Sequence, residues 1–141
     1  MFRTKLILFL ILLLSAGCAS MSGFDQHAYI QTTSLKVDAL NLMNSAVEDY
    51  YLHAAEVQSV NILLDKAYEY ERNRKNNAIT LQLWDKLRDT SGHLYGGFIN
   101  RWKRESSLNP VFIGESRRQV AEAFDKIAQL ESRKIKPKQL R

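Results

Sequence analysis

Cysteine, proline and glycine are all scarce in this chain of 141 residues. It contains 1 Cys, 2 Pro and 6 Gly. A single cysteine excludes an intrachain disulfide, so the fold must be held together by packing. The shortage of glycine and proline argues against a β-sandwich, which needs many tight turns, and against a Pro/Gly-rich linker protein.

Sequence motifs of metal and catalytic sites are also missing. There is no HExxH, no CxxC and no acidic calcium loop, and His27, His53 and His93 have no partner at ligand spacing. His53 lies on an apolar helical face, where a hydrogen-bonded core histidine is expected rather than a metal ligand. We therefore expect no enzymatic activity, no metal, no cofactor and no small-molecule substrate.

The chain also lacks an apolar run long enough to cross a bilayer. Its longest run, residues 6–14, has nine residues, whereas a transmembrane helix needs about 20. Arg3 and Lys5 precede this run, and the small residues Ser15, Ala16 and Gly17 follow it. A positive start, a short apolar segment and small residues at a cleavage site are typical of a secretory signal.

Residues 14–18, Leu-Ser-Ala-Gly-Cys, resemble the lipobox of bacterial lipoproteins, although Ser15 stands where this class more often has Leu. The resemblance implies that Cys18 receives a diacylglyceryl group on its sulfur. It also implies cleavage between Gly17 and Cys18 and acylation of the new amino group. The residue after the cysteine is Ala19 and not Asp. In enterobacterial sorting, the absence of Asp at this position favours the outer membrane. The implied location is the outer membrane of a Gram-negative cell, facing the periplasm.

The positive charge of the chain is concentrated near its two ends. The formal net charge is +5, but residues 18–132 contain slightly more acidic than basic residues. The last nine residues hold five bases and no acid: Arg133, Lys134, Lys136, Lys138 and Arg141. The basic balance therefore does not indicate nucleic-acid binding.

Pro137 and the mutual repulsion of these charges predict a disordered basic tail. Two interpretations of the tail remain open. It is either a solvating terminus without a partner or a segment that attaches to an anionic surface, such as lipid headgroups or cell-wall carboxylates.

Apolar residues recur at steps of three and four over the Gly- and Pro-free stretch that follows Phe24. This pattern predicts one long helix over about 27–72, roughly 65–70 Å in length. Shorter helices are predicted over 78–88, 98–104 and 110–133. The fold class expected is all-α, a small antiparallel bundle of three to four helices with one long N-terminal helix. The stripe on the long helix consists of Ala28, Leu35, Ala39, Leu42, Ala46, Tyr50, His53, Val57, Val60, Leu64 and Ala67.

These patterns divide the chain into four parts. Residues 1–17 form the signal peptide, 18–23 a lipidated tether, 24–132 the helical bundle and 133–141 the basic tail. Within the bundle, tyrosines occur as the pairs Tyr50/Tyr51 and Tyr68/Tyr70. One helix cannot easily bury both members of such a pair. We therefore expect Tyr51 or Tyr70 to be exposed and available to a partner.

Most of residues 24–131 resemble small helical lipoproteins of unassigned function from Gram-negative bacteria. The similarity lies in Phe24-Asp25, the segment from Leu35 to Met43, and Gly96-Gly97-Phe98 with Trp102, and it includes no catalytic motif. The leading interpretation is a non-enzymatic, lipid-anchored protein that binds or scaffolds another envelope protein or the cell wall. Candidate contacts are Tyr51, Tyr70, Arg133, Lys134, Lys136 and Lys138. A peptidoglycan-acting hydrolase or its regulator, and a surface-exposed exclusion or immunity lipoprotein, are the alternatives.

Replacing Cys18 with Ser is expected to leave an uncleaved precursor or a soluble product. Two or more acyl chains anchor a protein stably, at about 0.8 kcal/mol per buried methylene, and serine cannot take the thioether-linked lipid. Membrane fractionation combined with mass measurement checks this. A Cys18→Ser chain that sediments with the membrane as the cleaved mature form would show that lipid is not the anchor.

Overall fold

Five α-helices and two short 3₁₀ turns make up residues 23–132, which are the residues described by this computed structural model. The helices are α2 (Gln26–Asn44), α3 (Ala54–Arg72), α4 (Ala78–Arg88), α5 (Tyr95–Glu105) and α6 (Pro110–Glu131). No strand occurs within 23–132, which confirms the all-α class. Gly17, Cys18 and the basic residues Arg133, Lys134, Lys136 and Lys138 lie outside the described residues.

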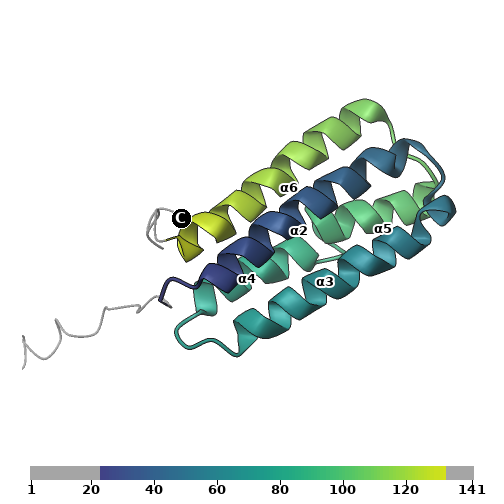
Figure 1. Ribbon diagram of the computed structural model, residues 1–141. Helices are drawn as coiled ribbons and strands as arrows, with labels where there is room; N and C mark the ends of the chain where they lie inside the picture. Colours follow the sequence, from purple (N-terminus) through teal and green to yellow (C-terminus); the bar gives the residue numbers. More distant parts are fainter. Residues whose placement is uncertain (1–22, 133–141) are drawn as a thin grey trace, which may run out of the picture.

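Helix α2 is the central element of the packing. It contacts both α6 and α3, while α4 contacts α3, α5 and α6 (Figure 1). Two contacts join α2 to α6 through polar groups: Lys36 Nζ lies 2.6 Å from Asp125 Oδ1, and Arg117 Nε donates to Leu40 O at 3.1 Å. The body is thus assembled around the first helix of the described chain.

The prediction of one continuous helix over 27–72 is wrong. The helix is interrupted by the 3₁₀ turns Ser45–Val47 and Tyr50–Leu52, with Glu48 in an extended conformation between them. Figure 1 shows that the chain turns back here and that α3 runs alongside α2. We call residues 45–53 the distal turn.

Contacts with the loop after α5 replace the helical hydrogen bonds that the distal turn gives up. Leu108 N donates to Ala46 O and Tyr50 N donates to Ser106 O, each at 2.7 Å. Trp102 Nε1 donates to Glu48 O at 2.9 Å. The apolar stripe continues through the turn because Ala46 and Tyr50 are still buried. Periodicity alone therefore could not reveal the break.

His53 closes the distal turn by bridging two carboxylates. Its Nε2 lies 2.7 Å from Glu48 Oε2 and its Nδ1 lies 3.2 Å from Glu56 Oε2. The hydrogen bond to Glu48, followed by that to Glu56, raises the pKa of His53 above its ordinary value. The resulting stabilisation is complete below the unfolded-state pKa of about 6.5 and is lost as pH rises through the folded pKa. His53 is half-buried rather than a core residue.

The rest of the predicted stripe is buried, and so are most of the residues predicted to face inward from the later helices. Trp84 and Phe124 pack edge to face with ring centroids 6.0 Å apart. Ile79 and Leu83 are half-buried rather than fully enclosed. The core is therefore a single apolar cluster that includes side chains from all five α-helices.

Helix α5 begins three residues earlier than the predicted start at 98, and glycine permits this. A Cβ atom on Gly96 would lie 2.2 Å from Arg88 O, and one on Gly97 would lie 1.8 Å from Gly92 O. The first turn of α5 thus rests directly on the backbone at the end of α4 and in the loop that follows it. Neither glycine has a positive φ angle, so close approach rather than backbone conformation requires them.

Truncating Leu64 to Ala is expected to lower the free energy of unfolding by about 2–5 kcal/mol, because this side chain is only 2% exposed. Leu52→Ala is the matched control, since Leu52 is 74% exposed and its truncation should change stability by less than about 0.5 kcal/mol. Urea denaturation followed by circular dichroism measures both. Equal losses in the two variants would contradict the arrangement of the core.

Candidate functional site

A cluster of buried charges ties together the two ends of the described chain. Arg74, in the loop after α3, places Nη1 2.8 Å from Glu71 Oε2 and 2.7 Å from Glu131 Oε2. Its Nη2 donates to Gly23 O at 2.9 Å. The Glu71 and Glu131 side chains are 1% and 3% exposed, so one guanidinium serves two carboxylates that are almost removed from water.

Neighbouring polar groups complete this cluster. Asn77 Nδ2 donates to Glu71 O at 2.9 Å and also to the Glu71 carboxylate. Burial raises the pKa of Glu131, and the hydrogen bond from Arg74 offsets this only in part. Such an arrangement is stable while the cation is present, because a buried carboxylate without a partner is strongly disfavoured. We call Glu71, Arg74, Asn77 and Glu131 the Arg74 cluster.

Tyr70 joins the start of α2 to the end of α3 beside this cluster. Its hydroxyl donates to Asp25 Oδ2 at 2.6 Å, and its ring lies 4.9 Å from that of His27. Asp25 also caps α2 by accepting hydrogen bonds from His27 N and Ala28 N. The hydrogen bond from Tyr70, more than any other contact, lowers the pKa of Asp25. Tyr70, predicted as a partner contact, is partly exposed and its hydroxyl is engaged within the protein.

The Arg74 cluster has a direct topological consequence. Gly23 and Glu131 both contact one guanidinium, so the chain enters α2 and leaves α6 at the same place. Figure 1 shows the start of α2 and the end of α6 at one end of the molecule, with the distal turn at the other. We call the end with Gly23 and Ser132 the terminal end.

The distal turn carries exposed apolar side chains. Tyr51, the other tyrosine predicted to be accessible, is 68% exposed, and its neighbour Leu52 is 74% exposed. Val47 in the same turn is 52% exposed. The structure therefore places Tyr51 and Tyr70 at opposite ends of the α2–α3 pair rather than in one site.

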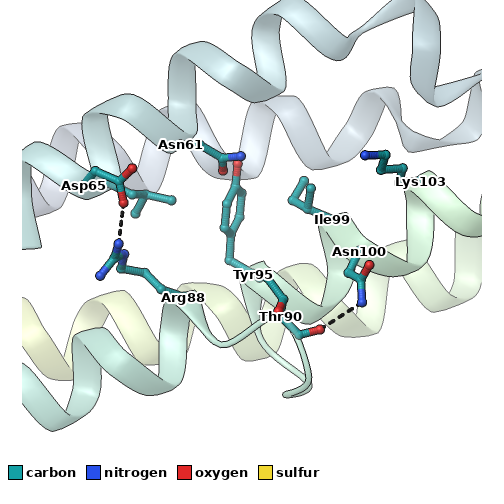
Figure 2. A pocket seen from close by; sticks show the side chains of 10 residues that line it. Asn61, Asp65, Arg88, Thr90, Tyr95, Ile99, Asn100 and Lys103 are labelled. Carbon is teal, nitrogen blue, oxygen red and sulfur yellow. Dashed lines mark hydrogen bonds and ion pairs between the residues drawn. The ribbon is translucent and has the colours of Figure 1, made fainter.

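A pocket of about 390 Å³ lies between α3, α5 and the segment that joins α4 to α5. Figure 2 shows the ion pair between Asp65 and Arg88 on one side of it and Lys103 on the other. Asn100 Nδ2 donates to Thr90 O at 3.1 Å across the lower edge. The pocket is lined by Asn61, Leu64, Asp65, Arg88, Thr90, Tyr95, Gly96, Ile99, Asn100 and Lys103.

Tyr95 is the unusual member of this pocket. The residue is 1% exposed, and its hydroxyl has no hydrogen-bond partner within residues 23–132. Figure 2 shows the hydroxyl end of the ring directed toward Asn61. Burial raises the pKa of Tyr95 well above its ordinary value, so the hydroxyl stays protonated at neutral pH.

Residues 23–132 meet neither the requirements of a metal site nor those of a membrane-spanning helix. Between residues 23 and 132, no group of three His, Cys, Asp or Glu side chains could hold a metal ion. None of the helices in this segment is both long and apolar enough to cross a bilayer.

Sequence reasoning missed both the Arg74 cluster and the pocket. Glu71 lies four residues after Ala67, and Glu131 lies four residues after Ile127, so each carboxylate occupies a core position of its helix. An acidic residue at a core position of a helix is the sequence signal that could have revealed this cluster. The pocket has no comparable signal, because its lining comes from three separate segments.

Comparison with known proteins identifies no relative of this chain: no protein-family model, no curated protein and no solved structure matches it.

Replacing Arg74 with Met is expected to lower the free energy of unfolding by about 3–5 kcal/mol, because Glu71 and Glu131 lose their shared cation. Arg72→Met is the matched control two residues away. The Arg72–Glu69 pair is solvent-exposed, so its loss should change stability by less than about 1 kcal/mol. Urea denaturation distinguishes the two. Equal, small losses would mean that Arg74 does not hold the terminal end together.

Proposed function

We propose that this protein is a non-enzymatic, lipid-anchored component of the bacterial envelope that binds or scaffolds another envelope component. In this proposal the bundle is antiparallel and is held by lipid on Cys18 to the periplasmic face of the outer membrane. The terminal end lies next to that membrane, and the distal turn is presented to the partner.

The observation that carries this proposal is the contact of Arg74 with both Gly23 and Glu131. Gly23 lies five residues after Cys18, and Glu131 lies two residues before the first base of the tail. A lipid on Cys18 and the bases of residues 133–141 would therefore act at one end of the body. The opposite end offers Tyr51, an aromatic side chain of the kind enriched at protein interfaces, next to the exposed Leu52.

The basic tail gives the membrane contact a second, electrostatic component in this proposal. Each Lys or Arg close to an anionic surface contributes about 1 kcal/mol, and the contribution falls off within a Debye length of about 8 Å. Because the lipid already supplies attachment, the tail would orient the body rather than hold it. Anchoring by lipid together with a basic segment is a common two-signal arrangement.

The arrangement of carboxylates favours binding over the alternative of a hydrolase. Hydrolysis of a glycosidic bond uses two carboxyl groups that face each other across an open cleft, about 5–9.5 Å apart. The pocket contains one carboxylate, Asp65, and it is paired with Arg88. Glu71 and Glu131 do approach each other from different helices, but they are buried and share Arg74.

The test places a photoreactive aromatic residue at position 51 of the full chain and irradiates intact cells of its own host. We expect a discrete adduct with one envelope component, and the same adduct from position 52. Val37 is the control position, because it is 56% exposed on the side of α2 and away from the distal turn. Treating intact cells with protease in parallel distinguishes a periplasmic from a surface-exposed protein.

Three results would contradict the proposal: no adduct from position 51 or 52, adducts only with a second copy of the chain, or the same adducts from position 37. Formation of the adduct should also fall in the Cys18→Ser chain, because the proposal requires the membrane anchor to bring the distal turn to its partner.

A further inference from the structure

We propose that the pocket beside Tyr95 binds the free carboxylate end of a short peptide. All the residues concerned lie within 23–132, and binding at this pocket does not require lipid anchoring. It goes beyond the proposed function because it assigns a second binding site, away from the distal turn, and gives that site a ligand chemistry.

The buried hydroxyl of Tyr95 requires a polar partner. A hydroxyl that is enclosed without a hydrogen bond is destabilising, and native proteins rarely leave one so. This hydroxyl is buried, unpaired within residues 23–132 and directed toward Asn61 at the pocket (Figure 2). Asn61 is exposed, so a ligand carbonyl at this side of the pocket could accept from its amide, and also from the Tyr95 hydroxyl once the Asn61 side chain turns aside.

The charges around the pocket favour a carboxylate. Arg88 is paired with Asp65 and lies over the Tyr68 ring, 4.3 Å from its centroid. Lys103 has no ion pair with any residue in 23–132 and faces Asp65 and Arg88 across the pocket (Figure 2). The lining therefore carries one uncompensated positive charge, which an anionic ligand would neutralise.

The remaining lining suits a peptide rather than a simple inorganic anion. The amide nitrogen of Asn100 donates to Thr90 O, so Asn100 Oδ1 can accept a hydrogen bond from a peptide N–H. Leu64 and Ile99 provide apolar wall for small side chains. The volume of about 390 Å³ lies within the range of small-ligand sites, and it exceeds what a single anion needs.

Isothermal titration calorimetry of the full chain in detergent micelles provides the test, with acetyl-alanyl-alanine as the probe. We expect saturable binding, with a Kd on the order of 1 mM. The C-terminal amide of the same peptide should bind about tenfold more weakly, because it has no charge for Lys103. The L,L and D,D forms are titrated separately. Preference for L,L would indicate a protein C-terminus, and preference for D,D a cell-wall peptide.

Three variants locate the binding. Tyr95→Phe should weaken binding about fivefold while leaving the melting temperature equal to or above that of the unaltered chain, since the hydroxyl has no partner in the fold. Lys103→Gln should weaken the acid about tenfold and leave the amide unchanged. Lys66→Gln is the control, because Lys66 is an exposed α3 lysine outside the pocket lining.

The inference is overturned if neither the L,L nor the D,D acid binds saturably to the unaltered chain. It is also overturned if the Tyr95→Phe and Lys103→Gln variants bind the acid as tightly as the Lys66→Gln variant does. A clear fall in melting temperature for Tyr95→Phe would also overturn it, because the hydroxyl would then have a partner in the fold. None of these results bears on lipid attachment or on the adducts from position 51, so the failure of this inference and that of the proposed function are distinguishable.

Discussion

One guanidinium shared by two buried carboxylates is the constraint on which the terminal end of this molecule depends. Glu71 and Glu131 come from α3 and α6, and both lie within 3 Å of Arg74 Nη1. Charges removed from water are strongly unfavourable unless they are paired and hydrogen-bonded. Because Arg74 also holds Gly23 O, the same group fixes the entry of the chain into α2 and its exit from α6. Apolar packing could bring these helices together, but it would not by itself position both chain ends around the guanidinium of Arg74.

That constraint separates the molecule into two ends of different character. The polar groups of the terminal end are internally satisfied, since Asp25, Tyr70 and the Arg74 cluster hydrogen-bond with one another or with the backbone, while Phe24 beside them is exposed. The distal turn is held by backbone pairing with residues 106–108 and by Trp102, which leaves Tyr51 and Leu52 exposed. The proposed function uses this difference: the terminal end would face the membrane and the distal turn would present Tyr51 and Leu52 to the partner. The pocket beside Tyr95 lies at the side of the body and shares no lining residue with the Arg74 cluster or the distal turn.

The sequence predicted the parts of this fold that depend on local periodicity. Most of the buried apolar positions followed from apolar spacing, because each helix packs one face against the core. The bounds of α4 and the start of α6 followed from local start and stop residues, such as Asn109-Pro110. It failed at the distal turn, where long-range hydrogen bonds from Leu108 and Trp102 replace helical ones without interrupting the apolar stripe. The Arg74 cluster was missed because an acidic residue at a core position is ordinarily assigned to a solvated face. The pocket could not be predicted, because it depends on how Gly96 lets α5 approach the backbone after α4.

The central claim is that the Arg74 cluster places both chain ends at one end of the body. Dipolar coupling between spin labels at positions 24 and 132, in a Cys18→Ser background, tests it most directly. We predict strong coupling with a narrow distance distribution, which becomes broad and weak when Arg74 is replaced by Met. Weak coupling with Arg74 intact, or coupling that Arg74→Met leaves unchanged, would contradict the account.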